Sequence, residues 1–101
     1  MLVPIVALED FFNFIEGTFD VKINEAPQNV IDKSGEYARF ILLDRFYVVR
    51  KPDESVKNPV LVEVWSSDRD HLERIEKTWM QWWSTKVLSD IEKDERTGDG
   101  S

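Results

Sequence analysis

The stretch that decides the fold is residues 71–91, HLERIEKTWMQWWSTKVLSDI, because it is the longest segment of the chain with a helical pattern. Ser67 or Asp68 can cap its start, and Asp70 and Glu73 put negative charge where the helix dipole favours it. We therefore expect a long helix whose aromatic side packs against the upstream residues. It holds three of the four tryptophans of the chain, Trp79, Trp82 and Trp83.

The apolar residues of this helix do not share one face. At about 100° per residue, one narrow stripe runs from Leu72 to Trp82, and the later apolar residues lie further round the helix. Either the helix bends near residues 84–85, so that both halves pack on one core, or its second half faces a partner. Tryptophan and methionine are enriched at the centres of protein interfaces. The predicted partner-binding residues are therefore Trp65, on the preceding strand, together with Met80, Trp83, Val87, Leu88 and Ile91.

The first third of the chain predicts a second helix and the start of a sheet. Over residues 4–16, apolar and acidic residues separate onto opposite sides of a helix, with Pro4 in its first turn and Gly17 at its end. The period then changes to two, which predicts a strand over residues 19–23. Residues 28–32 are expected to form a second, short strand.

Residues 36–51, EYARFILLDRFYVVRK, are apolar on both faces of a continuous strand, which is typical of a central strand covered on both sides. A bulge at Asp44 and Arg45 can swap the faces within one bent strand, or a tight bend there can separate two strands. We expect one bent strand, because no glycine, asparagine or proline supports a hairpin turn. A proline-bounded loop at residues 52–59 then leads to an antiparallel partner strand over residues 60–66.

These elements predict an α+β fold with an N-terminal helix, an antiparallel meander of three to four strands, and a long C-terminal helix packed on the sheet. If both helices lie on one face, the second apolar face of the central strand is available for oligomerisation. The length of 101 residues suits one domain, which we place at residues 1–93. The remaining residues, 94–101, are expected to form a flexible charged tail.

The charge of the chain disfavours several kinds of partner. Acidic residues outnumber basic ones 20 to 13, and the formal net charge of −7 repels nucleic-acid backbones and anionic membranes. A protein partner with a basic surface is compatible with it. The chain has no cysteine, no signal-peptide pattern and no apolar run of the roughly 20 residues that a membrane span requires. We therefore expect a cytoplasmic protein with neither a membrane nor a nucleic-acid partner.

Catalytic signals in the sequence are few. His71 is the only histidine, and beside Asp70 it is expected to be a solvated surface residue. No serine lies in a nucleophile-elbow pattern, and the four glycines form no phosphate-binding loop. The sequence therefore predicts no catalytic residue, no cofactor and no metal site.

One pattern supports an enzymatic alternative. A helix, antiparallel strands and a second helix resemble the core of many metal-dependent nucleases, whose acidic residues are an aspartate on one strand and a Glu-x-Lys on the next. Here Asp44 lies in the long strand, and Glu63 begins Glu63-Val64-Trp65, so that tryptophan takes the lysine position. Two carboxylates can bind Mg²⁺, and the resemblance implies an enzyme that uses Asp44 and Glu63.

The function expected from the sequence is non-enzymatic protein binding. An adaptor, inhibitor or chaperone-like factor would act through the aromatic C-terminal helix and the acidic exterior. The alternatives are the divergent Mg²⁺-dependent nuclease and a homo-oligomeric structural protein, for example a homodimer.

Overall fold

Three α-helices, one 3-10 turn and five strands form an α+β fold in the computed structural model, which describes residues 1–53 and 55–99. Side chains are described for residues 1–53 and 55–90. In chain order the elements are β1 (Leu2–Pro4), η1 (Ile5–Ala7), α1 (Leu8–Phe19), β2 (Asn24–Glu25), α2 (Gln28–Ser34), β3 (Glu36–Leu42), β4 (Arg45–Arg50), β5 (Leu61–Ser66) and α3 (Arg69–Asp99).

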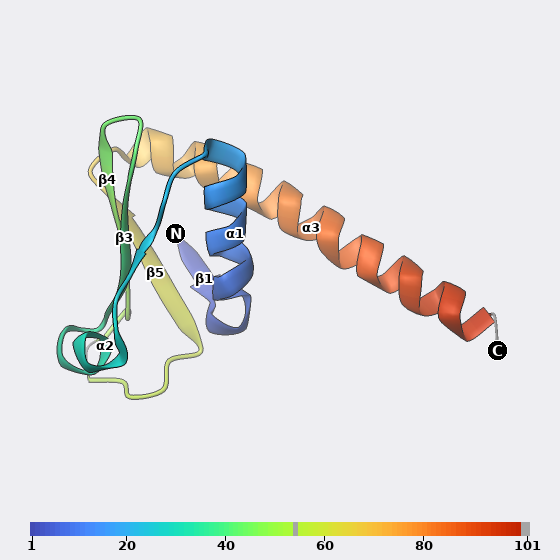
Figure 1. The fold of residues 1–101 in the computed structure, drawn as a ribbon, viewed down its shortest axis with the longest axis horizontal. Helices are drawn as coiled ribbons and strands as arrows, with labels where there is room; N and C mark the ends of the chain where they lie inside the picture. Colours follow the sequence, from blue (N-terminus) through green and yellow to red (C-terminus); the bar gives the residue numbers. More distant parts are fainter. Residues whose placement is uncertain (54, 100–101) are drawn as a thin grey trace.

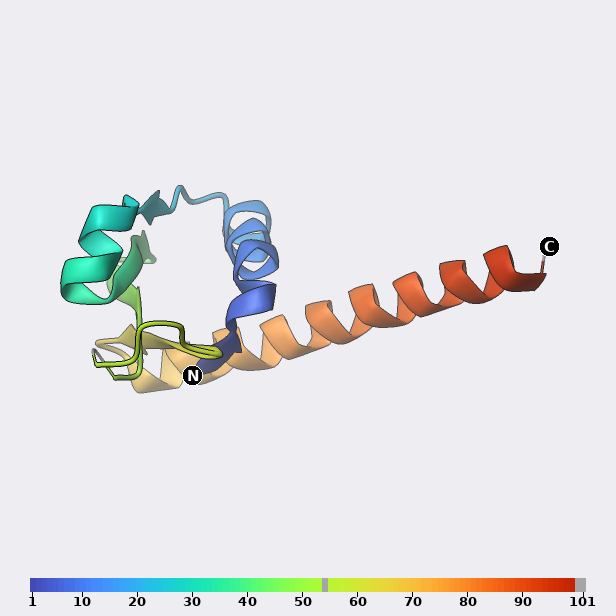
Figure 2. The ribbon, with the colours of Figure 1, turned by 90° about the horizontal axis from the view of Figure 1, so that it is seen from below.

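The strands form one antiparallel sheet in the order β1-β5-β4-β3-β2 (Figure 1). β3, β4 and β5 form an antiparallel meander, because each of the first two pairs with the strand that follows it. The sheet has five strands instead of the predicted three to four, and two of them are short strands at its edges. β1 pairs with β5 through Val3 and Val62, and β2 pairs with β3 through Asn24 and Arg39. Figure 2 shows that β2 and α2 lie at one end of the sheet, while β1 and α3 lie at the other.

α1 and α3 cover the same face of the sheet, as Figure 1 shows. On that face the strand side chains are buried, among them Phe40, Tyr47 and Val62. Phe11 of α1 and Trp79 of α3 meet above them edge to face, with ring centroids 5.2 Å apart. The opposite face of β3 and β4 carries no helix in the described part of the chain, and its large side chains stay partly exposed.

The predicted single bent strand over residues 36–51 is wrong, because a hairpin divides it into β3 and β4. Leu43 and Asp44 form its two-residue turn, both with positive φ, at 49° and 64°. A turn of two residues with positive φ matches the twist of the strands that it joins. Because of this turn, even-numbered residues such as Phe40 point inward on β3, whereas odd-numbered residues such as Tyr47 point inward on β4. The sequence therefore looks apolar on both faces although each strand buries only one.

Two further strand predictions are wrong. Residues 19–23 do not form a strand, because α1 continues through Phe19 and ends with Asp20 in the left-handed region, past the predicted end at Gly17. Residues 28–32 lie in the helix α2 instead. Local hydrogen bonds stabilise α2: the Gln28 side chain donates to Asp32 at 2.8 Å, and the Ser34 hydroxyl donates to the Val30 carbonyl at 2.9 Å.

The backbone of α3 continues through Asp99, past the predicted domain boundary at residue 93. The predicted mobility of residues 94–101 stays a prediction, and residues 100–101 lie outside the described residues. The cap of this helix is confirmed, because a carboxylate oxygen of Asp68 accepts a hydrogen bond from the His71 backbone N–H at 3.1 Å.

Trp79 is expected to contribute strongly to stability, because its side chain is 5% exposed and packs on two rings of α1. Trp79→Ala should lower the free energy of unfolding by about 3–5 kcal/mol. Met80→Ala is the matched control on the next residue of the helix, where the side chain is 59% exposed, and should change it by less than about 0.5 kcal/mol. Urea denaturation measures both. Equal effects of the two substitutions would contradict the placement of α3.

The β3–β4 turn is expected to be strained, because both of its central residues have side chains in the left-handed region. The double substitution Leu43→Asn and Asp44→Gly should therefore raise the free energy of unfolding by about 1 kcal/mol. Leu43→Ala is the control, since alanine keeps a Cβ in the same backbone conformation and Leu43 is an exposed residue. A double variant no more stable than the control in urea would show that the turn is not strained.

Candidate functional site

The second half of α3 leaves the body of the domain (Figure 1). Its 31 residues span about 46 Å at 1.5 Å per residue, close to the longest dimension of the described chain, 49 Å. Trp79 is buried, whereas Leu88, two and a half turns further on, is 61% exposed. The helix is continuous, so the first of the two alternatives, a bend near residues 84–85 that folds both halves onto one core, does not occur. The other alternative remains, in which the second half turns its apolar side chains away from the core.

A mostly apolar groove lies between β1 and the middle of α3. Its volume is about 530 Å³, and we name it the β1–α3 groove. Trp79 and Trp83 stack at its helical side, with ring centroids 5.5 Å apart. The edge strand β1 forms the other wall of the groove. It pairs with β5, and α3 packs on β5, so β1 lies beside the helix. The groove is lined by Met1, Leu2, Pro4, Glu76, Trp79, Met80 and Trp83.

The structure brings some of the predicted partner-binding residues together. Met80 and Trp83 share the β1–α3 groove, and Val87 and Leu88 follow them along the projecting helix. Trp83 and Val87 are half-buried, while Met80 and Leu88 are exposed. The side chain of Ile91 lies outside the described residues.

Trp65 lies apart from this group. It stands on β5 on the face of the sheet that no helix covers, and its side chain is 54% exposed. A smaller hollow of about 270 Å³ connects it to Met1, which also lines the β1–α3 groove. Trp65 therefore lies beside the first turn of α3, whose Arg69 and Leu72 line the same hollow, and not beside its projecting half.

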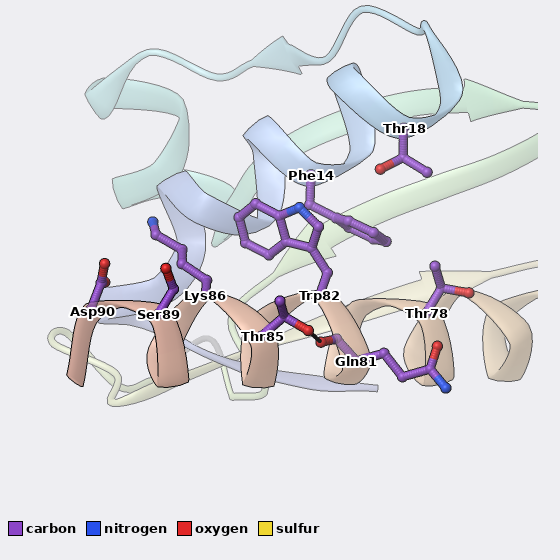
Figure 3. Close-up of a pocket in the computed structure, with 9 residues that line it drawn as sticks. All are labelled: Phe14, Thr18, Thr78, Gln81, Trp82, Thr85, Lys86, Ser89 and Asp90. Atoms are coloured by element: carbon purple, nitrogen blue, oxygen red, sulfur yellow. Dashed lines mark hydrogen bonds between the residues drawn. The ribbon is translucent and has the colours of Figure 1, made fainter. Parts of the chain in front are cut away.

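A second groove on the other flank of α3 was not found from the sequence. It lies between α1 and α3, has a volume of about 710 Å³ and is shown in Figure 3. Phe14 and Trp82 form its aromatic floor, with ring centroids 5.7 Å apart. Hydroxyl and amide side chains form most of its rim, namely Thr18, Thr78, Gln81, Thr85 and Ser89. We name it the α1–α3 groove.

Lys86 ties the two helices together at the α1–α3 groove. Its ammonium group forms an ion pair with Asp10 in the first turn of α1, and it lies over the Trp82 ring at 5.6 Å from the centroid. Asp10 and Lys86 are 76 residues apart in sequence, and no local pattern predicts such a pair. The pair leaves Glu9, Asn13 and Glu16 on the solvent side of α1.

His71 is not the solvated surface residue that the sequence predicted. It is half-buried at the start of α3, where its Nδ1 is hydrogen-bonded to the hydroxyl of the buried Tyr47. Burial and the nearby Arg45 guanidinium lower the pKa of His71, and burial raises the pKa of Tyr47. Arg45 also donates from Nε to Asp68 at 2.6 Å, and this hydrogen bond lowers the pKa of Asp68. The four side chains join β4 to the first turn of α3.

The two carboxylates of the nuclease alternative do not converge. Asp44 is in the turn before β4, whereas Glu63 on β5 pairs with Arg50 at the other end of β4. Asp44 is six residues before Arg50, which corresponds to about 20 Å along β4. Among the described residues, no group of three or more histidine, cysteine, aspartate or glutamate side chains is placed to hold a metal ion. The structure does not form the metal site that the resemblance implies.

Comparisons with known proteins leave the site to be interpreted from its own chemistry. No protein-family model, curated protein or solved structure matched the chain. Within the described residues, no helix has the length and apolar character needed to cross a membrane. What distinguishes the molecule is a helix that projects from the domain, with a groove on each flank.

The stability of the fold should depend on pH through His71. Its folded pKa is lowered, so the unfolded chain, with a pKa near 6.5, binds the proton more readily. Stability should therefore be constant above that value and fall as the pH drops below about 6.5 towards the folded pKa. Urea midpoints at pH 7.5 and 5.5 measure the loss, and His71→Gln should reduce it. An NMR titration that gave His71 a folded pKa of 6.5 or above would contradict this expectation.

Proposed function

We propose that this chain is a small acidic protein-binding module that engages its partner through the projecting half of α3. One observation carries the proposal: α3 continues well past its buried residues and presents exposed Met80 and Leu88 on its surface. Burial of such side chains is worth about 1.5–3 kcal/mol each, so leaving them in water has a cost that a partner would remove. The module would work in the cytoplasm without catalysis.

The shape of the surface favours a protein over a small molecule. Both grooves beside α3 are open, and the helix between them forms a ridge. A small ligand is usually enclosed on most sides by its pocket, whereas a partner protein can clasp a ridge and fill the grooves on both flanks. Trp82 and Trp83 point to opposite flanks, so each groove has a tryptophan of the kind that dominates binding energy.

The charge around α3 supports a partner with a basic rim. α1, which forms one wall of the α1–α3 groove, contains the acidic residues Glu9, Asp10 and Glu16 and no basic residue. Asp10 is paired with Lys86, and Asp90 adds another carboxylate at the rim of the groove. Together with the net charge of −7, these groups would attract a basic partner and raise its association rate.

The proposal is tested with a pair of variants of equal charge. Met80→Lys with Leu88→Lys places two charges on the exposed side of α3, and Val6→Lys with Val60→Lys places them on two other exposed residues, 89% and 78% accessible. A partner captured from cell extract by the wild-type chain is purified and titrated against all three proteins. The α3 variant should bind it at least about tenfold more weakly, the effect of losing about 1.4 kcal/mol.

The control variant should bind the same partner within about twofold of wild type, because its lysines lie away from both grooves. Circular dichroism checks that both variants keep the wild-type helix content. If the α3 variant binds as tightly as the control, α3 is not the binding surface.

A further inference from the structure

We infer that the face of the sheet that no helix covers is the interface of a homodimer, in which two copies pack sheet against sheet. We call it the open face. The inference goes beyond the proposed function, because it concerns a different partner and a surface that shares only the edge residue Leu2 with the β1–α3 groove. In Figure 1, α1 and α3 lie on the other side of the strands and α2 at their lower end, which leaves β3 and β4 bare on the open face in the described part of the chain.

The apolar side chains of the open face are contiguous. The strand register places Phe46 directly opposite Ile41, and Val48 directly opposite Trp65, so that apolar pairs run across β3, β4 and β5. Val48 is half-buried between these neighbours. Leu2 extends this apolar surface to the edge strand β1. The large exposed apolar side chains of the open face are Leu2, Ile41, Phe46, Leu61 and Trp65.

The apolar area of the open face is close to what a dimer of ordinary size requires. Phe46 and Trp65 are 48% and 54% exposed, and they contribute about 200 Å² if each ring has 150–250 Å² to bury. The three aliphatic residues, at about half exposure, bring the total to roughly 450 Å². A standard interface buries about 800 Å² on each partner, of which about 56–65% is non-polar, so it needs about 450–520 Å² of apolar surface.

The charges of the open face favour a second copy over the basic partner proposed for α3. Four charged residues stand among its apolar side chains: Glu36, Arg39, Arg50 and Glu63. Glu36 accepts a hydrogen bond from Arg39 at 2.7 Å, and Arg50 lies opposite both Glu36 and Glu63 in the strand register. Two positive and two negative charges cancel, so the net charge of −7 resides on the rest of the chain. Two open faces can therefore meet without the repulsion that two acidic surfaces would create.

The dimer that follows has four layers, with the two sheets about 10 Å apart and the α1 and α3 helices outside. The same patch faces itself across a two-fold axis, as in most homodimers. Trp65 is then an interface residue between copies and not part of the surface on the projecting half of α3. Met80 and Leu88 remain accessible, because they lie on α3 and not on the open face.

The test is light scattering coupled to size-exclusion chromatography on the full chain, loaded at 5–200 µM. The wild-type chain should elute with twice the mass of one chain at the upper concentrations. Phe46→Thr with Trp65→Thr should elute with the mass of one chain, since threonine keeps the strand propensity and removes the aromatic contacts. Val6→Thr with Val60→Thr is the matched control and should remain dimeric.

Two further variants complete the experiment. If the aromatic double variant is unfolded by circular dichroism, Arg39→Glu decides: it gives the open face a net charge of −2 and should weaken the dimer at least tenfold at low salt, with recovery in 0.5 M NaCl. Met80→Lys with Leu88→Lys should stay dimeric, which separates this inference from the partner site on α3. A monomeric wild type at 200 µM, or a dimer that survives the open-face substitutions in a folded chain, overturns the inference.

Discussion

The edge-to-face packing of Trp79 on Phe11 is the contact on which the arrangement of the molecule depends. It joins the only two long helices of the described chain over one face of the sheet, with Phe14 completing the cluster at 5.6 Å from Trp79. Because the anchor lies eleven residues into a helix of 31, most of α3 extends beyond it. Because both helices use one face, the other face remains uncovered. Both exposed apolar surfaces therefore follow from where this tryptophan sits.

Periodic patterns in the sequence predicted the elements whose packing they control. The two long helices and the strand around Val62 and Val64 follow from the spacing of apolar residues, since burial on one side imposes that spacing. The hairpin at Leu43 and Asp44 has no such signal. Strand pairing on both sides of the turn forces these residues into left-handed conformations that their side chains disfavour. The helix α2 was missed because only Val30 and Ile31 of its residues are apolar, too few to show a period.

The candidate site was predictable only where it depended on a single helix. The turn of the apolar stripe around α3 placed Met80 and Leu88 away from the buried stripe, and both side chains are exposed, because the geometry of one helix fixes the direction of each side chain. Their role in partner binding stays a prediction. The α1–α3 groove requires knowledge of which helices are neighbours, and the ion pair of Lys86 with Asp10 spans most of the chain. The hydrogen bond between Tyr47 and His71 likewise depends on β4 lying beneath the start of α3.

The distribution of charge gives the two apolar surfaces different partners. Self-association through an acidic surface would bring like charges together, so a chain with net charge −7 can dimerise easily only where its charges cancel. The open face meets this condition with Arg39 and Arg50 set against Glu36 and Glu63. The surface around α3 does not, because α1 supplies acidic groups alone. A dimer formed through the neutral face would present two acidic, aromatic helices. A partner with two basic sites would then bind more tightly than either contact alone allows, as long as the spacing of its sites matched that of the helices.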